Sequence, residues 1–156
     1  MTTIASAATA TLDSIETLRF ADAEEHTISL DALGVLYLVD FWALGCKRCI
    51  LEMPELERLA KDYEPGGRFR FVGVVWGGWK GKDLWTVAER ANTKLPVYSD
   101  PENWFQRLGI EGYPTKIMIR DGKVLRRARG GGAGAYATRK KAIDDQPRSS
   151  PAASQP

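Results

Sequence analysis

The two cysteines of this chain, Cys46 and Cys49, are the residues whose type and spacing point most directly to a chemistry. Lys47 and Arg48 separate them, and a strand-like apolar run over residues 35–42 precedes them. Two thiols at this spacing can close a small disulfide and open it again. The first thiol is expected at a helix N-terminus, where backbone N–H groups and the helix dipole favour the thiolate. The pattern predicts thiol–disulfide exchange, with Cys46 as nucleophile and Cys49 as resolving cysteine.

Hydrophobic periodicity predicts the elements that position this pair. The run over 35–42, broken only by Asp40, is typical of a strand buried on both faces. Asp121-Gly122, between two strand-like runs, predicts a hairpin with a type I′ turn. The expected elements are a hairpin over 18–30, a strand over 35–42, a helix over 46–63, a strand over 68–76, a helix over 82–93, an edge strand over 95–98, a helix over 102–108 and a hairpin of strands 115–120 and 123–128. This order predicts an α/β fold.

The helix over 46–63 has one apolar stripe at helical spacing, formed by Ile50, Met53, Leu56, Leu59, Ala60 and Tyr63. The charged residues of this segment, Glu52 among them, are placed largely off the stripe. Pro54 lies inside the segment and is expected to kink the helix.

Composition indicates one domain with unstructured ends. A chain of 156 residues has room for a single domain with a real core. The Ala/Thr-rich segment 1–14 is expected to be disordered, and residues 15–130 are expected to form the domain. The tail over 131–156 is expected to be weakly helical and then to continue as a disordered, basic and Ser/Pro-rich stretch.

Charge and hydropathy exclude several classes of function. The net charge of +2 is too small to indicate nucleic-acid or membrane binding. No window offers the roughly 20 apolar residues of a membrane span, and the first residues lack the pattern of a secretory signal. We therefore expect a cytoplasmic protein that binds no nucleic acid. The basic residues over 126–129 and 139–141 are expected to form a solvated face, and His26 to be a surface residue.

The active-site segment resembles that of the thioredoxins. The run over 39–49, Val-Asp-Phe-Trp-Ala-Leu-Gly-Cys-Lys-Arg-Cys, resembles their redox motif, and Pro54 falls where they carry a helix-kinking proline. The run Gly-Tyr-Pro-Thr over 112–115 resembles the loop whose cis proline faces the disulfide. Gly45 stands where the family usually has Trp, and the Lys-Arg dipeptide also differs from the usual one.

An added segment narrows this resemblance. The spacing from Cys46 to Pro114 leaves room for an extra α/β unit around 78–100, which, with the leading hairpin, is similar to the TlpA-like (AhpC-TSA-type) branch of thiol:disulfide oxidoreductases. The resemblance implies a thioredoxin fold: a central mixed β-sheet flanked by helices, with an N-terminal β-hairpin and a βα insert before the cis-Pro strand.

The resemblance also implies roles for individual residues. Asp40 would accept the proton of Cys49 through water and would have a raised pKa; the alternative is an aspartate that faces solvent. No obvious lysine on the neighbouring strand is available to pair with it. Pro114, after Tyr113, would leave backbone groups open to an extended substrate, unless it is an ordinary trans turn proline. Trp42 is expected beside the site, or else purely in the core.

The segment Trp76-Gly77-Gly78-Trp79 follows a predicted parallel strand, so we expect it at the edge of the sheet that holds the cysteines. Two interpretations are open. The tryptophans could form an aromatic wall for a partner protein, or they could pack inward as part of an ordinary loop.

These features predict a thiol–disulfide oxidoreductase that acts on protein disulfides, uses no metal or organic cofactor and receives electrons from an upstream thiol donor. A peroxiredoxin-like peroxidase is disfavoured, because the threonine and arginine expected around a peroxidatic cysteine are not recognisable. Alternatives from another class are a Cu(I)- or Zn²⁺-binding module, in which a dimer shares the metal site, and a redox-inactive adaptor. The weakly apolar segment over 135–145 leaves the choice between monomer and weak dimer open.

Lys47 and Arg48 generate a first testable prediction. Positive charge beside a thiolate lowers the cysteine pKa and stabilises the reduced form, which makes the disulfide a better oxidant. We expect a redox potential less negative than the roughly −270 mV typical of thioredoxin. A glutathione titration with thiol trapping measures it, and a value at or below that of thioredoxin contradicts the tuning role.

Overall fold

The computed structural model describes residues 15–131 and 134–147. The predicted disordered segment 1–14 and the Ser/Pro-rich end of the tail, residues 148–156, lie outside the described residues. Among the described residues, no helix has the length and apolar character needed to cross a membrane.

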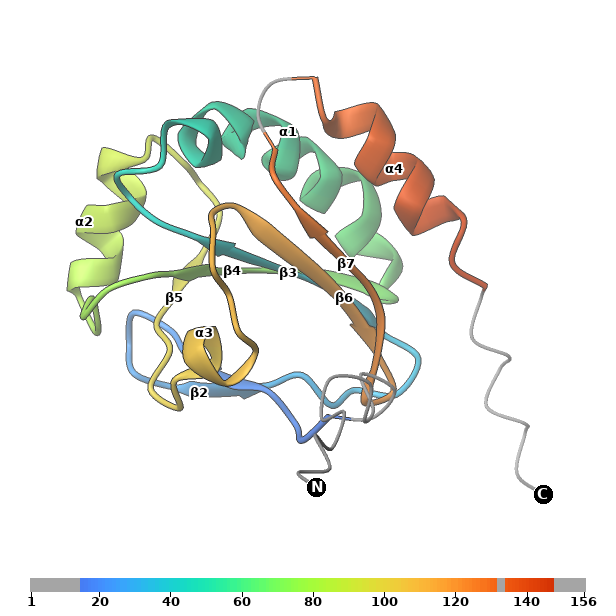
Figure 1. Ribbon diagram of the computed structural model, residues 1–156, viewed down its shortest axis with the longest axis horizontal. Helices are drawn as coiled ribbons and strands as arrows, with labels where there is room; N and C mark the ends of the chain where they lie inside the picture. The colour runs from blue at the N-terminus through green and yellow to red at the C-terminus, as the bar shows by residue number, and fades with distance from the viewer. Residues whose placement is uncertain (1–14, 132–133, 148–156) are drawn as a thin grey trace, which may run out of the picture.

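A five-stranded mixed sheet forms the centre of the domain, with strand order β5-β4-β3-β6-β7 (Figure 1). The strands are β3 (Leu36–Trp42), β4 (Phe69–Val75), β5 (Val97–Tyr98), β6 (Thr115–Arg120) and β7 (Lys123–Arg129). Strand β3 pairs in parallel with β4 and antiparallel with β6. All seven residues of β3 are buried, because elements cover both faces of the sheet.

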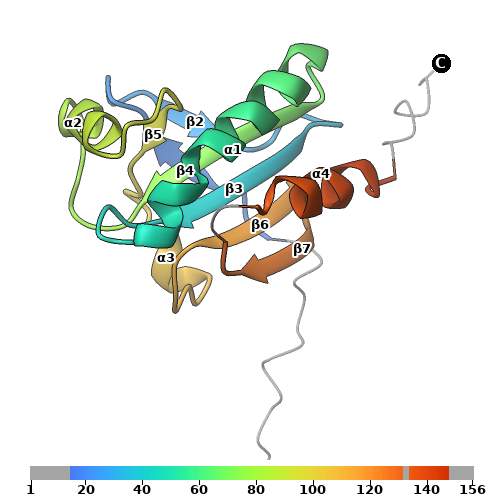
Figure 2. The same cartoon turned by 90° about the horizontal axis from the view of Figure 1, so that it is seen from above.

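Helices and a small hairpin cover the two faces of this sheet. The helices are α1 (Lys47–Tyr63), α2 (Asp83–Arg90), α3 (Trp104–Arg107) and α4 (Tyr136–Asp144), with a short 3₁₀ turn, η1 (Glu64–Gly66), after α1; the hairpin consists of β1 (Arg19–Ala21) and β2 (Thr27–Ser29). Figure 1 shows α1 and α4 above the sheet, with the hairpin and α3 below it. Seen from above, α1 runs across the sheet and α4 lies beside it (Figure 2). The predicted thioredoxin fold with an N-terminal hairpin is confirmed.

The central strand separates two apolar cores by the alternation of its side chains. Leu36, Leu38 and Trp42 belong to the core beneath α1, whereas Tyr37 and Phe41 belong to the core beneath the hairpin and α3. Because side chains alternate between the faces of a strand, residue 40 must point to the α1 side. The strand therefore places Asp40 under the helix that begins at the cysteine motif.

The helix α1 has a wider buried face than the sequence suggested. Its buried residues are Cys49, Glu52, Met53, Leu56, Leu59 and Ala60. The placement of Glu52 off the buried stripe was wrong, since its side chain is 0% exposed. Spacings of three and four residues from Cys49 to Leu56 put Glu52 on the inner face, where partners described below balance its charge.

Polar contacts hold α4 against α1, which compensates for its few apolar residues. Ala142 and Ile143 are buried in the α1-side core. The Tyr63 hydroxyl donates to Asp144 at 2.6 Å, and the Tyr136 hydroxyl donates to Asp62 at 2.6 Å. The segment that the sequence assigned to a weakly helical tail therefore packs on the domain as a helix.

Leu56 provides a test of the core beneath α1. Its side chain is 0% exposed, so Leu56→Ala would leave a cavity and should lower the free energy of unfolding by about 2–5 kcal/mol. Leu51→Ala is the matched control on the same helix, because Leu51 is 51% exposed, and it should change the value by less than about 0.5 kcal/mol. Urea unfolding of the oxidised proteins measures both; equal losses would contradict the packing described.

Candidate active site

The two cysteines form a disulfide at the N-terminus of α1. Cys46 is the N-cap residue, and its sulfur accepts a hydrogen bond from the backbone N–H of Cys49 at 3.2 Å. The Cα atoms of the disulfide-bonded pair are 5.2 Å apart. Cys49 is 1% exposed, whereas Cys46 is only partly buried. A substrate can therefore reach Cys46 more easily than Cys49, as the predicted order of nucleophile and resolving cysteine requires.

The loop before β6 lies beside this motif. The Tyr113–Pro114 peptide bond is cis. Phe41 of β3 pairs with Thr115 of β6, so the antiparallel register sets Pro114 opposite Trp42 at the end of the sheet. Trp42 is 1% exposed, a burial that favours the core role over direct contact with a substrate. Tyr113 is partly exposed and remains available for contact.

A cluster of four charged side chains lies inside the protein between β3, β6, α1 and α4. The Lys116 ammonium is 2.9 Å from Asp40 Oδ1 and 2.7 Å from Glu52 Oε1. The Arg139 Nε atom of α4 donates to Glu52 Oε1 at 2.5 Å. The side chains of Asp40, Glu52 and Lys116 are 1%, 0% and 3% exposed. Two carboxylates and two cations thus balance in charge, as buried ionic groups require.

The expectation that no lysine pairs with Asp40 was wrong. Lys116 stands directly opposite Asp40 in the antiparallel register of β3 and β6. This pairing depends on which residue of β6 aligns with which residue of β3, and the sequence alone does not fix that register. The burial of Glu52, in contrast, could have been predicted from the sequence. Counting in steps of three and four residues along the helix places it on the buried stripe, whatever its charge.

Burial raises the pKa of Asp40 above its ordinary value of 3.8, and the neighbouring carboxylate of Glu52 acts in the same direction, whereas the ammonium of Lys116 lowers it. The Oδ1 atom accepts from Lys116, but the buried Oδ2 atom has no hydrogen-bond partner among the described residues. A carboxyl group with a raised pKa, and with one oxygen that has no hydrogen-bond partner among the described residues, is suited to accepting a proton.

Arg139 connects this cluster to the cis-proline loop. Its Nη2 atom donates to the Gly130 carbonyl at 3.2 Å, and the Gly130 N–H donates to the Pro114 carbonyl at 2.8 Å. A Cβ atom on Gly131 would collide with the Glu52 carboxylate and the Pro114 ring, so only glycine allows this close approach. Arg139 therefore ties α4 to both α1 and the loop beside the disulfide.

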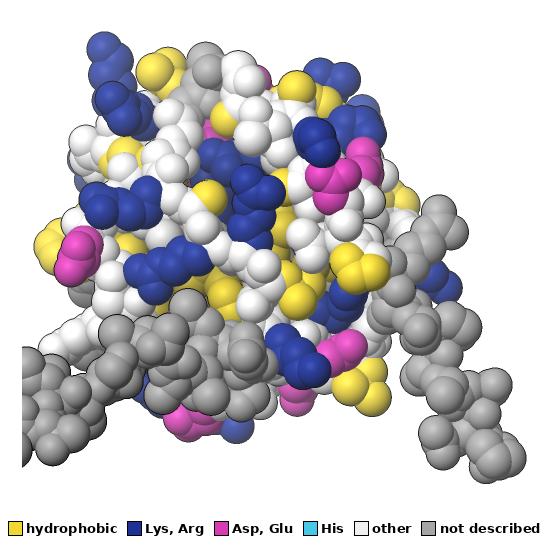
Figure 3. All heavy atoms as spheres, turned by 45° about the vertical axis from the view of Figure 1, so that its right-hand side comes forward, with side chains coloured by type: hydrophobic (Ala, Val, Ile, Leu, Met, Phe, Trp, Pro, Cys, Tyr) yellow, Lys and Arg dark blue, Asp and Glu magenta, His cyan; other side chains and the backbone are white. Residues whose placement is uncertain are grey.

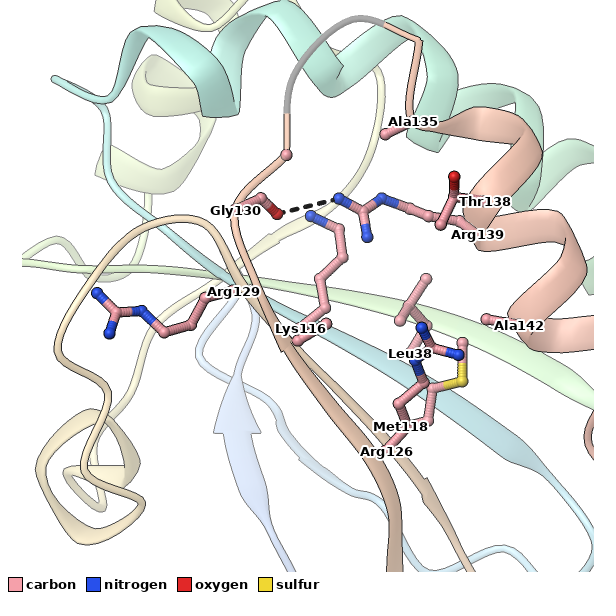
Figure 4. A pocket seen from close by; sticks show the side chains of 12 residues that line it. Leu38, Lys116, Met118, Arg126, Arg129, Gly130, Ala135, Thr138, Arg139 and Ala142 are labelled. Atoms are coloured by element: carbon pink, nitrogen blue, oxygen red, sulfur yellow. Dashed lines mark hydrogen bonds between the residues drawn. The ribbon is translucent and has the colours of Figure 1, made fainter.

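A pocket of about 240 Å³ lies between α4 and strands β6 and β7. Leu38, Met118 and Ala142 contribute apolar surface, while Lys116 and Arg139 reach it from the charged cluster. Figure 4 shows the cationic ends of these two side chains close together, and both contact Glu52 Oε1. On this side of the molecule, Lys and Arg side chains surround patches of hydrophobic surface (Figure 3).

The two tryptophans of the loop after β4 differ in exposure. Trp79 agrees with the inward-packed interpretation, whereas a role of Trp76 in an aromatic wall for a partner stays a prediction. Trp79 folds back over Gly77 and packs against the α1-side core. Trp76 is 55% exposed, and its ring centroid lies 6.2 Å from that of Tyr113. Lys47 and Arg48, between the cysteines, are both exposed.

Comparisons with known proteins agree with this geometry. No protein-family model matches this chain. The thioredoxin-like protein YneN of Bacillus subtilis is 27% identical over 95 residues, covering 61% of this chain and 56% of YneN. A thioredoxin of Chlorobaculum thiosulfatiphilum is 35% identical over 88 residues, covering 56% of this chain and 59% of the relative. The chain thus spans less than two thirds of the length of these curated relatives.

A solved structure gives wider coverage. A proposed thiol:disulfide interchange protein, DsbE, from Chlorobium tepidum has a TM-score of 0.70 and 25% identity, and the match covers 84% of this chain and 93% of that one. This chain belongs to the thioredoxin-like superfamily. The similarity to DsbE and to YneN also supports the TlpA-like branch. As in the predicted pattern, this thioredoxin-like protein carries its disulfide at the start of α1.

Asp40 in this thioredoxin-like domain should make stability depend on pH. Because its folded pKa lies above the unfolded value, the folded state binds more protons between the two values, and stability falls as pH rises. Asp40→Asn removes this loss. The unfolding free energy of the variant relative to the wild type should therefore increase with pH from about 4 upward until the folded pKa is passed.

Urea unfolding of the oxidised proteins at several pH values measures this difference. Asp31→Asn is the control, because Asp31 is exposed, and it should show no comparable trend. A difference for Asp40→Asn that stays constant or decreases with pH would contradict the raised pKa. The proposed role in proton transfer has a separate test: an exchange rate unchanged by Asp40→Asn across about pH 6–9 would exclude it.

Proposed function

We propose that this protein is a thiol–disulfide oxidoreductase acting on protein disulfides. The observation that carries the proposal is the Cys46–Cys49 disulfide at the start of α1, in which Cys46 is partly exposed and Cys49 is buried. Thioredoxins and thiol:disulfide oxidoreductases among its relatives support the same reaction class. They do not favour the metal-binding or adaptor alternatives.

The reaction proceeds in two exchanges in the reducing direction. The thiolate of Cys46 attacks one sulfur of the substrate disulfide, forms a mixed disulfide and releases the first substrate thiolate, which takes up a proton. Cys49 loses its proton and attacks the sulfur of Cys46, which releases the second substrate thiolate. Two electrons pass to the substrate. Its two thiolates take up the proton that Cys46 released to solvent when it ionised and the proton that Cys49 loses, and the protein is left with the Cys46–Cys49 disulfide.

The neighbouring residues support these exchanges in different ways. Asp40, with its raised pKa and uncommitted Oδ2 atom, accepts the proton of Cys49 through water. Tyr113 and Pro114 contact the substrate chain, and Lys47 and Arg48 tune the potential. An upstream dithiol donor reduces the disulfide again and closes the cycle. The cytoplasmic location stays a prediction.

Single cysteine variants test the proposed order of attack. Cys49→Ser should accumulate a mixed disulfide between Cys46 and the substrate, because no resolving thiol remains. Cys46→Ser should form no such adduct, because the remaining cysteine is buried. Non-reducing gels and intact mass spectrometry with a disulfide-containing protein such as insulin measure both.

The wild-type protein with dithiothreitol is the positive control of this experiment. A wild type that reduces no disulfide would reject the proposed activity itself. If an adduct forms on Cys49 in the Cys46→Ser variant as fast as on Cys46 in the Cys49→Ser variant, the assigned roles of nucleophile and resolving cysteine are contradicted.

A further inference from the structure

The surface beside Cys46 combines the exposed Trp76 and the partly exposed Tyr113 with cations that have no acidic partner among the described residues. We propose that the preferred substrate is a protein segment that presents its disulfide in extended conformation, with a large apolar side chain that packs on Trp76 and Tyr113 and an acidic side chain that meets Lys47 and Arg48. This inference rests on the proposed function, because it names the class of protein disulfide that the same site accepts.

The aromatic part of this surface has a rigid base. Phe105, which is buried, packs edge-on against Tyr113 with ring centroids 5.9 Å apart, and against Phe41 at 5.0 Å. Tyr113 in turn contacts Trp76, whose side chain is 55% exposed. A row of rings therefore leads from the core to the surface and ends on an exposed indole. Such a ring offers a large apolar contact at small cost in side-chain entropy.

The loop after β4 exposes Trp76 and packs Trp79, which is partly buried, against the core. Gly77 has a φ angle of +113°, a conformation that other residues rarely adopt. The indole of Trp79 folds back against this glycine, with its Cδ1 atom 3.2 Å from where a Cβ would lie. The exposed orientation of Trp76 is therefore a consequence of the turn at Gly77.

Backbone pairing places Trp76 and Tyr113 at the end of the sheet from which the chain leads to Cys46. The N–H of Trp76 donates to the carbonyl of Trp42 at 2.7 Å, and Trp42 precedes Cys46 by four residues. Pro114, next to Tyr113, directly precedes Thr115, which pairs with Phe41, the residue before Trp42. A substrate chain that passes Pro114 in extended conformation can reach Cys46 with its disulfide and the Trp76–Tyr113 pair with a nearby side chain.

The charge of this edge selects for acidic substrate residues. Lys47 and Arg48 are exposed, and neither forms an ion pair with any of the residues that the structure describes. The first turn of α1 carries no acidic residue, and its helix dipole adds positive potential. Arg129 adds a third cation, since its Nη2 atom would lie 2.8 Å from a Cβ on Gly112 in the loop of Tyr113. Partners of such a surface carry the opposite charge.

Peptides with one intermolecular disulfide test this inference directly. One peptide carries a leucine and two glutamates beside its cysteine, a second has lysines in place of the glutamates, and a third has serine in place of leucine. The measured quantity is kcat/KM for reduction of each peptide by the full chain. Dithiothreitol regenerates the reduced protein, and the rate at which dithiothreitol itself reduces the peptide is subtracted.

The wild type should prefer the first peptide over each of the others by about three- to tenfold. Trp76→Ala should remove the preference for leucine over serine. Trp85→Ala is the matched control, because Trp85 on α2 is 56% exposed and lies outside the proposed surface, and it should keep that preference. Lys47→Glu combined with Arg48→Glu should reverse the preference between glutamate and lysine peptides.

The use of ratios between peptides separates docking from redox tuning. A change in the potential of Cys46–Cys49 alters the rates of all peptides together and leaves the ratios unchanged. Equal kcat/KM for the three peptides, or the same loss of leucine preference in Trp85→Ala as in Trp76→Ala, would overturn the inference.

A small neutral disulfide, 2-hydroxyethyl disulfide, distinguishes this failure from failure of the proposed function. If the wild type reduces it but shows no peptide preference, the substrate surface is wrong and the activity stands. If the wild type reduces neither this compound nor any peptide, the proposed oxidoreductase activity itself is wrong. Far-UV circular dichroism of each variant checks that its fold is retained.

Discussion

The sharing of one buried ammonium between two carboxylates is the interaction on which the rest of the site depends. Lys116 lies 2.9 Å from Asp40 and 2.7 Å from Glu52. Removing a charge from water costs on the order of several kcal/mol. Partners of opposite charge must compensate for this lost hydration. Loss of Lys116 would leave the buried carboxylate of Asp40 without its hydrogen-bonded cation, whereas Glu52 would keep Arg139. The strands, the active-site helix and α4 must therefore stay in the arrangement that keeps this cluster complete.

The same cluster explains why the C-terminal helix belongs to the active site as well as to the fold. Arg139 balances the second carboxylate, Glu52, and its bond to Gly130 reaches the loop that ends in Pro114. The apolar contribution of α4 is small, and tyrosine–aspartate hydrogen bonds supply much of its contact with α1. A helix that looks weak in sequence is thus held by charge and polar pairing, which apolar periodicity does not reveal.

Around the disulfide, the buried residues and the exposed residues have different proposed roles. Inside, burial raises the pKa of Asp40, which suits a group that exchanges a proton with a neighbouring thiol. Outside, Lys47, Arg48 and the ring of Trp76 are exposed, and we propose that they form the surface that meets the substrate protein. The reacting sulfur of Cys46 lies at the boundary of the two. Because Lys47 and Arg48 are also proposed to tune the potential of the disulfide, only Trp76 among these outer residues separates recognition from the redox chemistry.

The sequence by itself predicted the proposed reaction class and determined the order of the elements. The CxxC motif, Pro54 and the Gly-Tyr-Pro-Thr run are local patterns, and the type I′ turn at Asp121-Gly122 depends on neighbouring residues, with φ angles of +51° and +74°. Only the tertiary structure decided the partners of Asp40. Lys116 is 76 positions away along the chain and Glu52 belongs to another element, so their meeting depends on strand register and helix packing, which long-range contacts determine.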